Sequence, residues 1–147
     1  MNDLDQAKQA LTSDPSALGS PKVDALIEAM FLAATADGEF SPEESLQFVA
    51  TIEALSDRKL QGDALMRLVG TLAERLRVDG RPARLAAVAE RLPAGKGRET
   101  ALILAAAITA SDGEVRGSEN DLVADLAEAL GVAPDRAIEL VARVTRR

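Results

Sequence analysis

Apolar residues recur at helical spacing along almost the whole of this chain of 147 residues, and most Pro and Gly residues lie between the periodic stretches. This pattern is typical of amphipathic helices joined by short turns. Aromatic residues make up only 2% of a chain that is 47% hydrophobic. Ala, Leu, Val and Ile must therefore fill the core, which favours closely packed helices over strands. The pattern predicts helices over residues 2–11, 21–36, 42–55, 61–78, 82–92, 98–111, 118–130 and 134–145.

The length of the chain predicts its domain organisation. A chain of 147 residues is close to one average domain and is long enough to bury a core. We therefore expect a single all-α bundle of about seven to eight helices over residues 1–147, in which 1–20 is a short N-terminal segment.

The absence of Cys and His restricts the chemistry that the chain can perform. Thiol nucleophiles, imidazole catalysis, disulfides and zinc sites with nitrogen or sulfur ligands are excluded, so any bound metal must have oxygen ligands. The polar N-terminal residues do not form a signal peptide, which favours a cytoplasmic location. The longest uncharged apolar run, 101–110, is shorter than the roughly 20 residues that a bilayer requires, so we expect no membrane insertion.

The charge distribution argues against nucleic acid as a partner. The net charge is −7, whereas binding to phosphates requires clustered Lys and Arg. Segment 56–98 is basic and its flanks are acidic. We expect the arginines of this segment, which lack neighbouring aromatic residues for base stacking, to pair with acids or to face solvent. They include Arg75, Arg77, Arg81 and Arg84.

The chain contains an internal repeat. A shift of 75 residues aligns 26–55 with 101–130, and both segments contain an apolar helix, an Asp-Gly-Glu corner and an amphipathic helix. The matching corner residues are Asp37, Gly38, Glu39 and Glu44 in the first copy and Asp112, Gly113, Glu114 and Glu119 in the second. We expect repeat units over about 21–57 and 98–131 to form a pseudo-two-fold bundle of helix-corner-helix units.

At these residues the chain resembles the TerB (tellurite-resistance) family, including the related N-terminal domain of DjlA-type membrane-anchored co-chaperones. The resemblance covers most of the chain and rests on 33–40 with Glu44 and on 110–115 with Glu119. It implies an all-α interaction module linked to stress and tellurite resistance, and not an enzyme. It also implies divalent-cation binding by the acidic corner residues.

Two roles for the corner acids stay open. Carboxylates suit a hard cation such as Ca²⁺, Mg²⁺ or Mn²⁺, and the predicted ligands are Asp37, Glu39, Glu44, Asp112, Glu114 and Glu119. The spacing is not that of an EF-hand, because the first and third loop positions would fall on apolar helices.

The alternative role is structural and needs no ion. The Asp residues can accept backbone hydrogen bonds across the turn, and Glu44 can form a capping box with Ser41. In the second copy Arg116 replaces this Ser, so Glu119 lacks the equivalent partner, although Ser118 could begin a shifted capping box.

These observations lead to three hypotheses. The first is a TerB-like cytoplasmic domain that binds protein partners, in or near a membrane complex, with a divalent cation at its acidic corners. The second is a metal-independent interaction scaffold similar to the co-chaperone domain. The third and weakest is a metal-dependent hydrolase, because no His, activated nucleophile or phosphate-binding loop is present.

Overall fold

The computed structural model describes residues 21–35, 42–55, 62–92, 95–110 and 117–145. Within these residues the chain forms seven helices and no strand, which confirms the predicted all-α fold. The helix predicted over residues 2–11 lies outside the described residues. The helices are α2 (Pro21–Ala34), α3 (Pro42–Leu55), α4 (Asp63–Asp79), α5 (Arg81–Arg91), α6 (Lys96–Ala110), α7 (Gly117–Leu130) and α8 (Pro134–Thr145).

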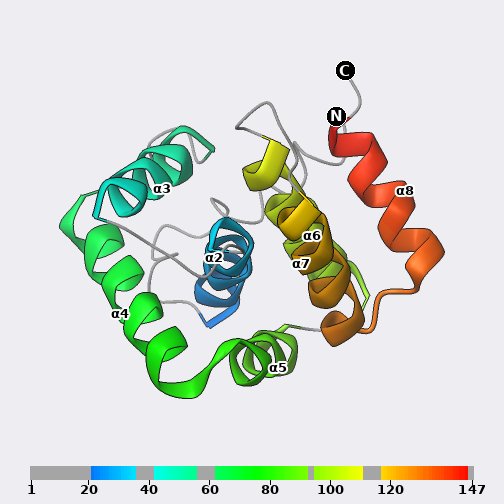
Figure 1. Cartoon of the computed structure of the whole chain (residues 1–147), viewed down its shortest axis with the longest axis horizontal. Coiled ribbons are helices and arrows are strands. Elements are labelled where there is room, and N and C mark those ends of the chain that lie inside the picture. The colour runs from blue at the N-terminus through cyan, green and yellow to red at the C-terminus, as the bar shows by residue number, and fades with distance from the viewer. Residues whose placement is uncertain (1–20, 36–41, 56–61, 93–94, 111–116, 146–147) are drawn as a thin grey trace.

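The core of the bundle is built on α2 and α6, which pack against each other more extensively than any other pair of these helices. Every side chain from Ala25 to Ala33 is buried, and so is every side chain from Thr100 to Ala106. A helix that is apolar around its whole circumference must be covered on all sides. Figure 1 shows α2 in the middle of the bundle, and α4, α5, α6 and α7 all contact it.

The outer helices are amphipathic and bury one face each. In α5 the buried side chains are Leu85, Val88 and Ala89, while α8 lies against α6 and α7. The attachment of α3 is different, because it packs mainly against α4. Its Phe48 also reaches Phe31 of α2 in an edge-to-face contact, with 5.7 Å between the ring centroids, a favourable geometry for two aromatic rings.

The helix boundaries follow the internal repeat. The helices α2 and α6 begin at Pro21 and Lys96, 75 residues apart. The same offset separates the starts of α3 and α7, and it also separates their ends at Leu55 and Leu130. The packing of the two units is less similar, because α7 contacts α2, α5, α6 and α8 whereas α3 relies on α4.

Two predicted helix ends coincide with glycines in the left-handed region. Gly80 has φ 85° and follows α4, and Gly131 has φ 73° and follows α7. At Gly131 the backbone N–H donates to the carbonyl of Glu128 at 3.1 Å, and the N–H of Val132 donates to the carbonyl of Ala127 at 2.9 Å. This pair of bonds is a Schellman motif, which satisfies carbonyls at the end of the helix.

One predicted linker is partly helical. We expected residues 93–97 to separate two helices and the second repeat unit to begin near 98, but α6 begins at Lys96. The first turn closes there because the N–H of Glu99 donates to the carbonyl of Gly95 at 3.1 Å. Among the described residues, no helix has the length and the apolar surface needed to span a bilayer.

Candidate functional site

The helices on either side of the two acidic corners begin at equivalent positions of the repeat. The first corner joins α2 to α3, and the second joins α6 to α7. Glu44 and Glu119 are each the third residue of the helix that follows, although their side chains are outside the described set. The remaining predicted ligands lie outside the described residues, and they are Asp37, Glu39, Asp112 and Glu114.

The described side chains do not form a metal site of their own. Among them, no group of three or more acidic side chains is placed to hold an ion. All six predicted ligands are outside that set, so the cation site stays a prediction.

The helix starts bear on the two capping boxes expected from the sequence. Glu44 is at the third helical position of α3, the position that a capping box with Ser41 requires. In the second copy α7 begins at Gly117, so Ser118 lies inside the helix and not at its N-cap. The side chains of Ser118 and Glu119 are outside the described set, so the shifted capping box and the role of Glu119 stay predictions.

An arginine of α5 contacts the C-terminal end of α2, which leads into the first corner. Thr35 is buried, and both its backbone N–H and its hydroxyl donate to the carbonyl of Phe31 at 3.0 Å. The guanidinium of Arg81 donates to the carbonyl of Thr35, and also to its hydroxyl at 3.3 Å. A cation at the end of α2 also complements the negative end of the helix dipole. The residue that binds this guanidinium, Thr35, is two residues before Asp37 in the sequence.

The second corner begins without an equivalent hydroxyl. Ala110 occupies the position that Thr35 has in the first copy, and it carries no hydrogen-bonding side chain. The two copies therefore differ in sequence at this position.

A buried ion-pair cluster joins α2 to α5. Glu28 lies in the middle of α2 and is only 1% exposed. Arg84 donates to both of its oxygens, from Nε to Oε2 at 2.6 Å and from Nη2 to Oε1 at 2.9 Å. Arg91 donates to Oε1 as well, and Arg84 also contacts Asp79 at 3.0 Å. The hydrogen bonds to Glu28 raise the pKa of Arg84 above its ordinary value.

Asp24 lies one turn before Glu28 on the same helix. Its Oδ1 is buried and is the one such side-chain atom without a hydrogen-bond partner in the described part of the chain. Burial raises the pKa of Asp24, Arg91 and Arg75 lower it, and the nearby charge of Glu28 raises it further. An ionised carboxylate in this position is costly because its lost hydration is not replaced.

Arg98 joins three helices by hydrogen bonds to backbone carbonyls. The guanidinium of Arg98, near the start of α6, donates to the carbonyl of Leu130 at 3.1 Å and to that of Ala89 at 3.1 Å. Its Nε donates to the carbonyl of Leu92 at 3.4 Å. These acceptors are at the C-terminal ends of α7 and α5, where the last carbonyls have few helical partners, although the carbonyl of Ala89 also accepts from the N–H of Leu92 at 3.4 Å. One side chain thus caps two helix ends.

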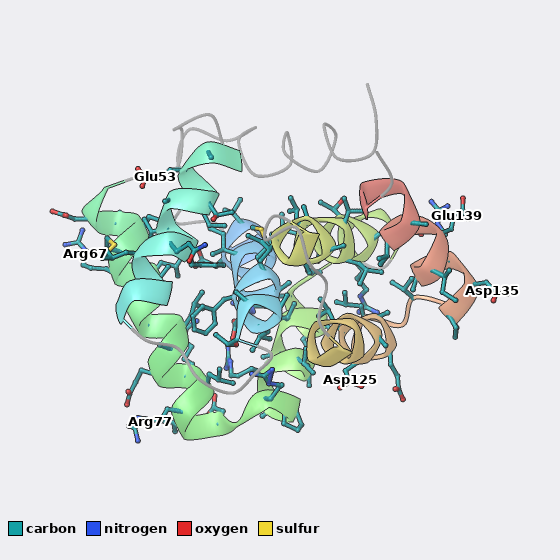
Figure 2. All side chains as sticks on the ribbon, turned by 45° about the horizontal axis from the view of Figure 1, so that its top comes forward. Glu53, Arg67, Arg77, Asp125, Asp135 and Glu139 are labelled. Atoms are coloured by element: carbon teal, nitrogen blue, oxygen red, sulfur yellow. The ribbon has the colours of Figure 1, made fainter. Side chains whose placement is uncertain are left out.

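Exposed charged side chains of both signs lie on the outside of the bundle, with Glu53 of α3 near Arg67 of α4 (Figure 2). Figure 2 shows Arg67 and Arg77 directed away from the core on α4, and Asp125, Asp135 and Glu139 on α7 and α8 at the other side. Some arginines of the basic segment 56–98 face solvent, and others are directed into the bundle. Arg77 pairs with the exposed Glu74, as expected, whereas Arg84 points inward to Glu28.

Sequence reasoning did not single out Glu28, Asp24 or Arg98. One signal was present for the two acids. Asp24 and Glu28 are four residues apart in a helix otherwise rich in apolar residues, so they share one face. A carboxylate inside a core helix requires partners, and the arginines of α5 supply them to Glu28. The identity of those partners depends on tertiary packing.

Comparison with known proteins identifies no relative of this chain: no protein-family model, no curated protein and no solved structure matches it.

Proposed function

We propose that this chain is a TerB-like interaction domain that binds protein partners in a stress or tellurite response and binds a divalent cation at its acidic corners. The observation that carries this proposal is the register of the helices. Both corners join helices whose starts are 75 residues apart, and the helices that lead into them form the central pair of the core. A corner that leaves a rigid, buried helix is well placed to hold ligands in a fixed geometry.

The alternative is a metal-independent interaction scaffold, and one contact favours it for the first corner. Arg81 brings a positive charge to the end of α2, where it opposes a second cation and holds the end of this helix without one. The second copy has Ala110 in place of Thr35 and Arg116 in place of Ser41, so its sequence offers neither that hydroxyl at the end of α6 nor the equivalent capping partner for Glu119. Under the proposed function, the second corner is therefore the stronger cation site.

Calorimetric titration with Ca²⁺, Mg²⁺ and Mn²⁺ tests the cation site. The variants are Asp37→Asn, Asp112→Asn and the double variant, and the matched control is Asp125→Asn, which removes an exposed carboxylate of α7 away from the corners. We expect saturable binding to the wild type and the control, a larger loss from Asp112→Asn than from Asp37→Asn, and no binding to the double variant. Circular dichroism confirms that each variant folds. If the wild type does not bind at millimolar ion, the scaffold alternative replaces the cation site.

The physiological part of the proposal has its own test. A strain that lacks the gene is complemented with the wild type, with the double variant or with Asp125→Asn, and growth on tellurite is measured. We expect only the double variant to fail. Equal growth of all strains, including the uncomplemented one, would contradict the link to tellurite.

A further inference from the structure

The helix α4 has one face in the core and one face in solvent. It contacts α2, α3 and α5, and its buried side chains are Leu65, Val69 and Leu72. Figure 1 shows α4 at the outer edge of the bundle, and in Figure 2 Arg67 and Arg77 point away from the core. The outer face of α4 is therefore exposed along the length of the helix.

The charges on this outer face follow a self-complementary order. Five exposed residues at helical spacing form a stripe along it, and they are Asp63, Arg67, Gly70, Glu74 and Arg77. From the start of the helix the charges are negative, positive, none, negative and positive. From the end of the helix they are positive, negative, none, positive and negative. Each charge therefore meets its opposite when the stripe is reversed against itself.

A second copy of α4 in antiparallel orientation would bring these opposite charges together. Asp63 and Arg77 are each seven residues from Gly70, so each lies opposite the other across a crossing at Gly70. Arg67 and Glu74 are three and four residues from Gly70, on opposite sides of it, and they face each other in the same way. A two-fold interface requires this kind of self-complementarity, in which every contact occurs twice.

Gly70 leaves the centre of the stripe without a side chain. A Cβ added to Gly70 would meet no other atom within 4 Å, so the packing around it does not require a glycine. A glycine inside a helix is less favourable than an alanine. At the crossing of two helices, however, the side chains at the contact determine the distance between the helix axes. A glycine there allows the two backbones to approach closely.

Two large apolar side chains flank the charged stripe. Met66 is 42% exposed and Val78 is 64% exposed. Single exposed apolar residues are ordinary on protein surfaces, but these two lie on the two edges of one stripe. Their apolar surface would be removed from water in a helix pair, which is favourable. Apolar area and charge complementarity thus occur on the same face.

We propose that the exposed face of α4 is a self-association surface, through which two copies of the chain pair antiparallel with Gly70 at the crossing point. A contact of one helix with its copy belongs to the small class of interfaces, below about 1,200 Å² in total. The dissociation constant should therefore be high, on the order of 100 μM. The surface does not depend on the proposed cation site, because the acidic corners join other helices.

The ion pair between Glu74 and Arg77 within α4 is compatible with this dimer. Both side chains are exposed, and a carboxylate has acceptor sites for more than one donor. In the dimer, Arg67 of the second copy approaches Glu74, and Asp63 of the second copy approaches Arg77. Four charges of alternating sign then lie on each side of the crossing. Such complementarity determines the register of the two helices more than it determines affinity.

Sedimentation equilibrium over a range of protein concentrations tests the crossing point. The variant is Gly70→Gln, which places a long side chain at the centre of the stripe. Gln is a better helix former than Gly, so the monomer should still fold. The matched control is Ala86→Gln, which places the same side chain at an exposed position of α5. We expect a dissociation constant about tenfold higher for Gly70→Gln and an unchanged one for the control.

Two charge reversals test the antiparallel register. Arg67→Glu and Glu74→Arg each place like charges opposite each other in both halves of the dimer, so each variant alone should associate about tenfold more weakly. In an equimolar mixture, the new acid at position 67 of one variant faces the new base at position 74 of the other. The unchanged Glu74 and Arg67 face each other as well. The mixture should therefore dimerise about as well as the wild type.

A second control separates this register from net charge. Asp125→Arg changes the net charge by as much as Glu74→Arg, at an exposed position of α7. It should dimerise like the wild type. High salt should weaken the wild-type dimer, because exposed charge pairs are screened. Circular dichroism checks that every variant folds.

Three outcomes would overturn the self-association surface. The first is a wild type that stays monomeric at about 1 mM. The second is a dimer that forms equally well with Gly70→Gln, which would place the contact on another face. The third is a mixture of Arg67→Glu and Glu74→Arg that associates no better than either variant alone, which would exclude the antiparallel register.

Discussion

Glu28 of α2 and Arg84 of α5 form a two-point ion pair between residues 56 positions apart in the sequence, and the carboxylate is 1% exposed. Burying two charges removes their hydration, so a pair of this kind adds little net stability over an apolar contact of the same shape. Its loss is nevertheless costly, because the largely buried Arg84 then keeps the partly exposed Asp79 in place of a fully buried counter-charge. The pair therefore determines how α5 is placed on α2 more than it determines the total stability.

The substitution Glu28→Gln should destabilise the protein by about 3 to 5 kcal/mol, since it leaves Arg84 and Arg91 without their shared counter-charge. Urea unfolding measures this change. The matched control is Glu74→Gln, which breaks another Glu–Arg pair, with side chains that are 61% and 70% exposed. That control should unfold almost as the wild type does. Similar losses in both variants would show that Glu28 is not a buried partner.

Two glycine substitutions should change stability in opposite directions. Gly131 has φ 73°, a backbone conformation that is strained for a residue with a Cβ, so Gly131→Ala should cost about 1 to 2 kcal/mol. Gly70 is inside α4 with open space around its Cα, so Gly70→Ala should stabilise the protein by about 0.5 to 1 kcal/mol. The shift in Tm checks both signs. A stabilising Gly131→Ala would contradict the left-handed end of α7.

Arg98→Met should lower the free energy of unfolding by about 2 to 4 kcal/mol, because three carbonyls lose a charged donor while most of the side-chain volume is kept. The control is Arg136→Met, which removes an arginine whose side chain is 39% exposed and pairs with Glu99 and Glu139 rather than with backbone carbonyls. Denaturant unfolding should show a clearly smaller effect for this control. If Arg136→Met costs as much as Arg98→Met, the capping role of Arg98 is wrong.

Arg81→Gln should strengthen cation binding at the first corner, if the proposed cation site exists. The substitution removes the positive charge that Arg81 places on Thr35, which is two residues before Asp37 in the sequence. It therefore removes part of the repulsion on an incoming ion. Calorimetric titration in the Asp112→Asn background isolates the first corner. Weaker binding than in Asp112→Asn alone would indicate that Arg81 holds the corner in its binding geometry.

Local sequence signals predicted most of the fold. Helical periodicity located α2 to α8, and Gly80 and Gly131 correctly marked two helix ends, because these features depend on residues close together in the chain. The start of α6 was missed because Gly95, Lys96 and Gly97 have the composition of a linker. The helix begins there because a backbone hydrogen bond to Gly95 closes its first turn.

The candidate sites were harder to predict from the sequence than the helices. The repeat identified the corner acids as a set, but sequence spacing does not place carboxylates around an ion, and their side chains lie outside the described set. The cluster at Glu28 was missed for another reason. Its arginines are 56 and 63 residues away in the sequence, and such a pair is visible only when α5 lies on α2.

The three acceptors of Arg98 bear on how the protein unfolds. Leu130 ends the second repeat unit, whereas Ala89 and Leu92 belong to the segment between the units. Melting of α7 would therefore also loosen the end of α5, and melting of α5 would loosen the end of α7. The contact between α2 and α6 also joins the two repeat units. We therefore expect the two units to unfold together. Calorimetry should record a single unfolding transition whose van't Hoff and calorimetric enthalpies agree.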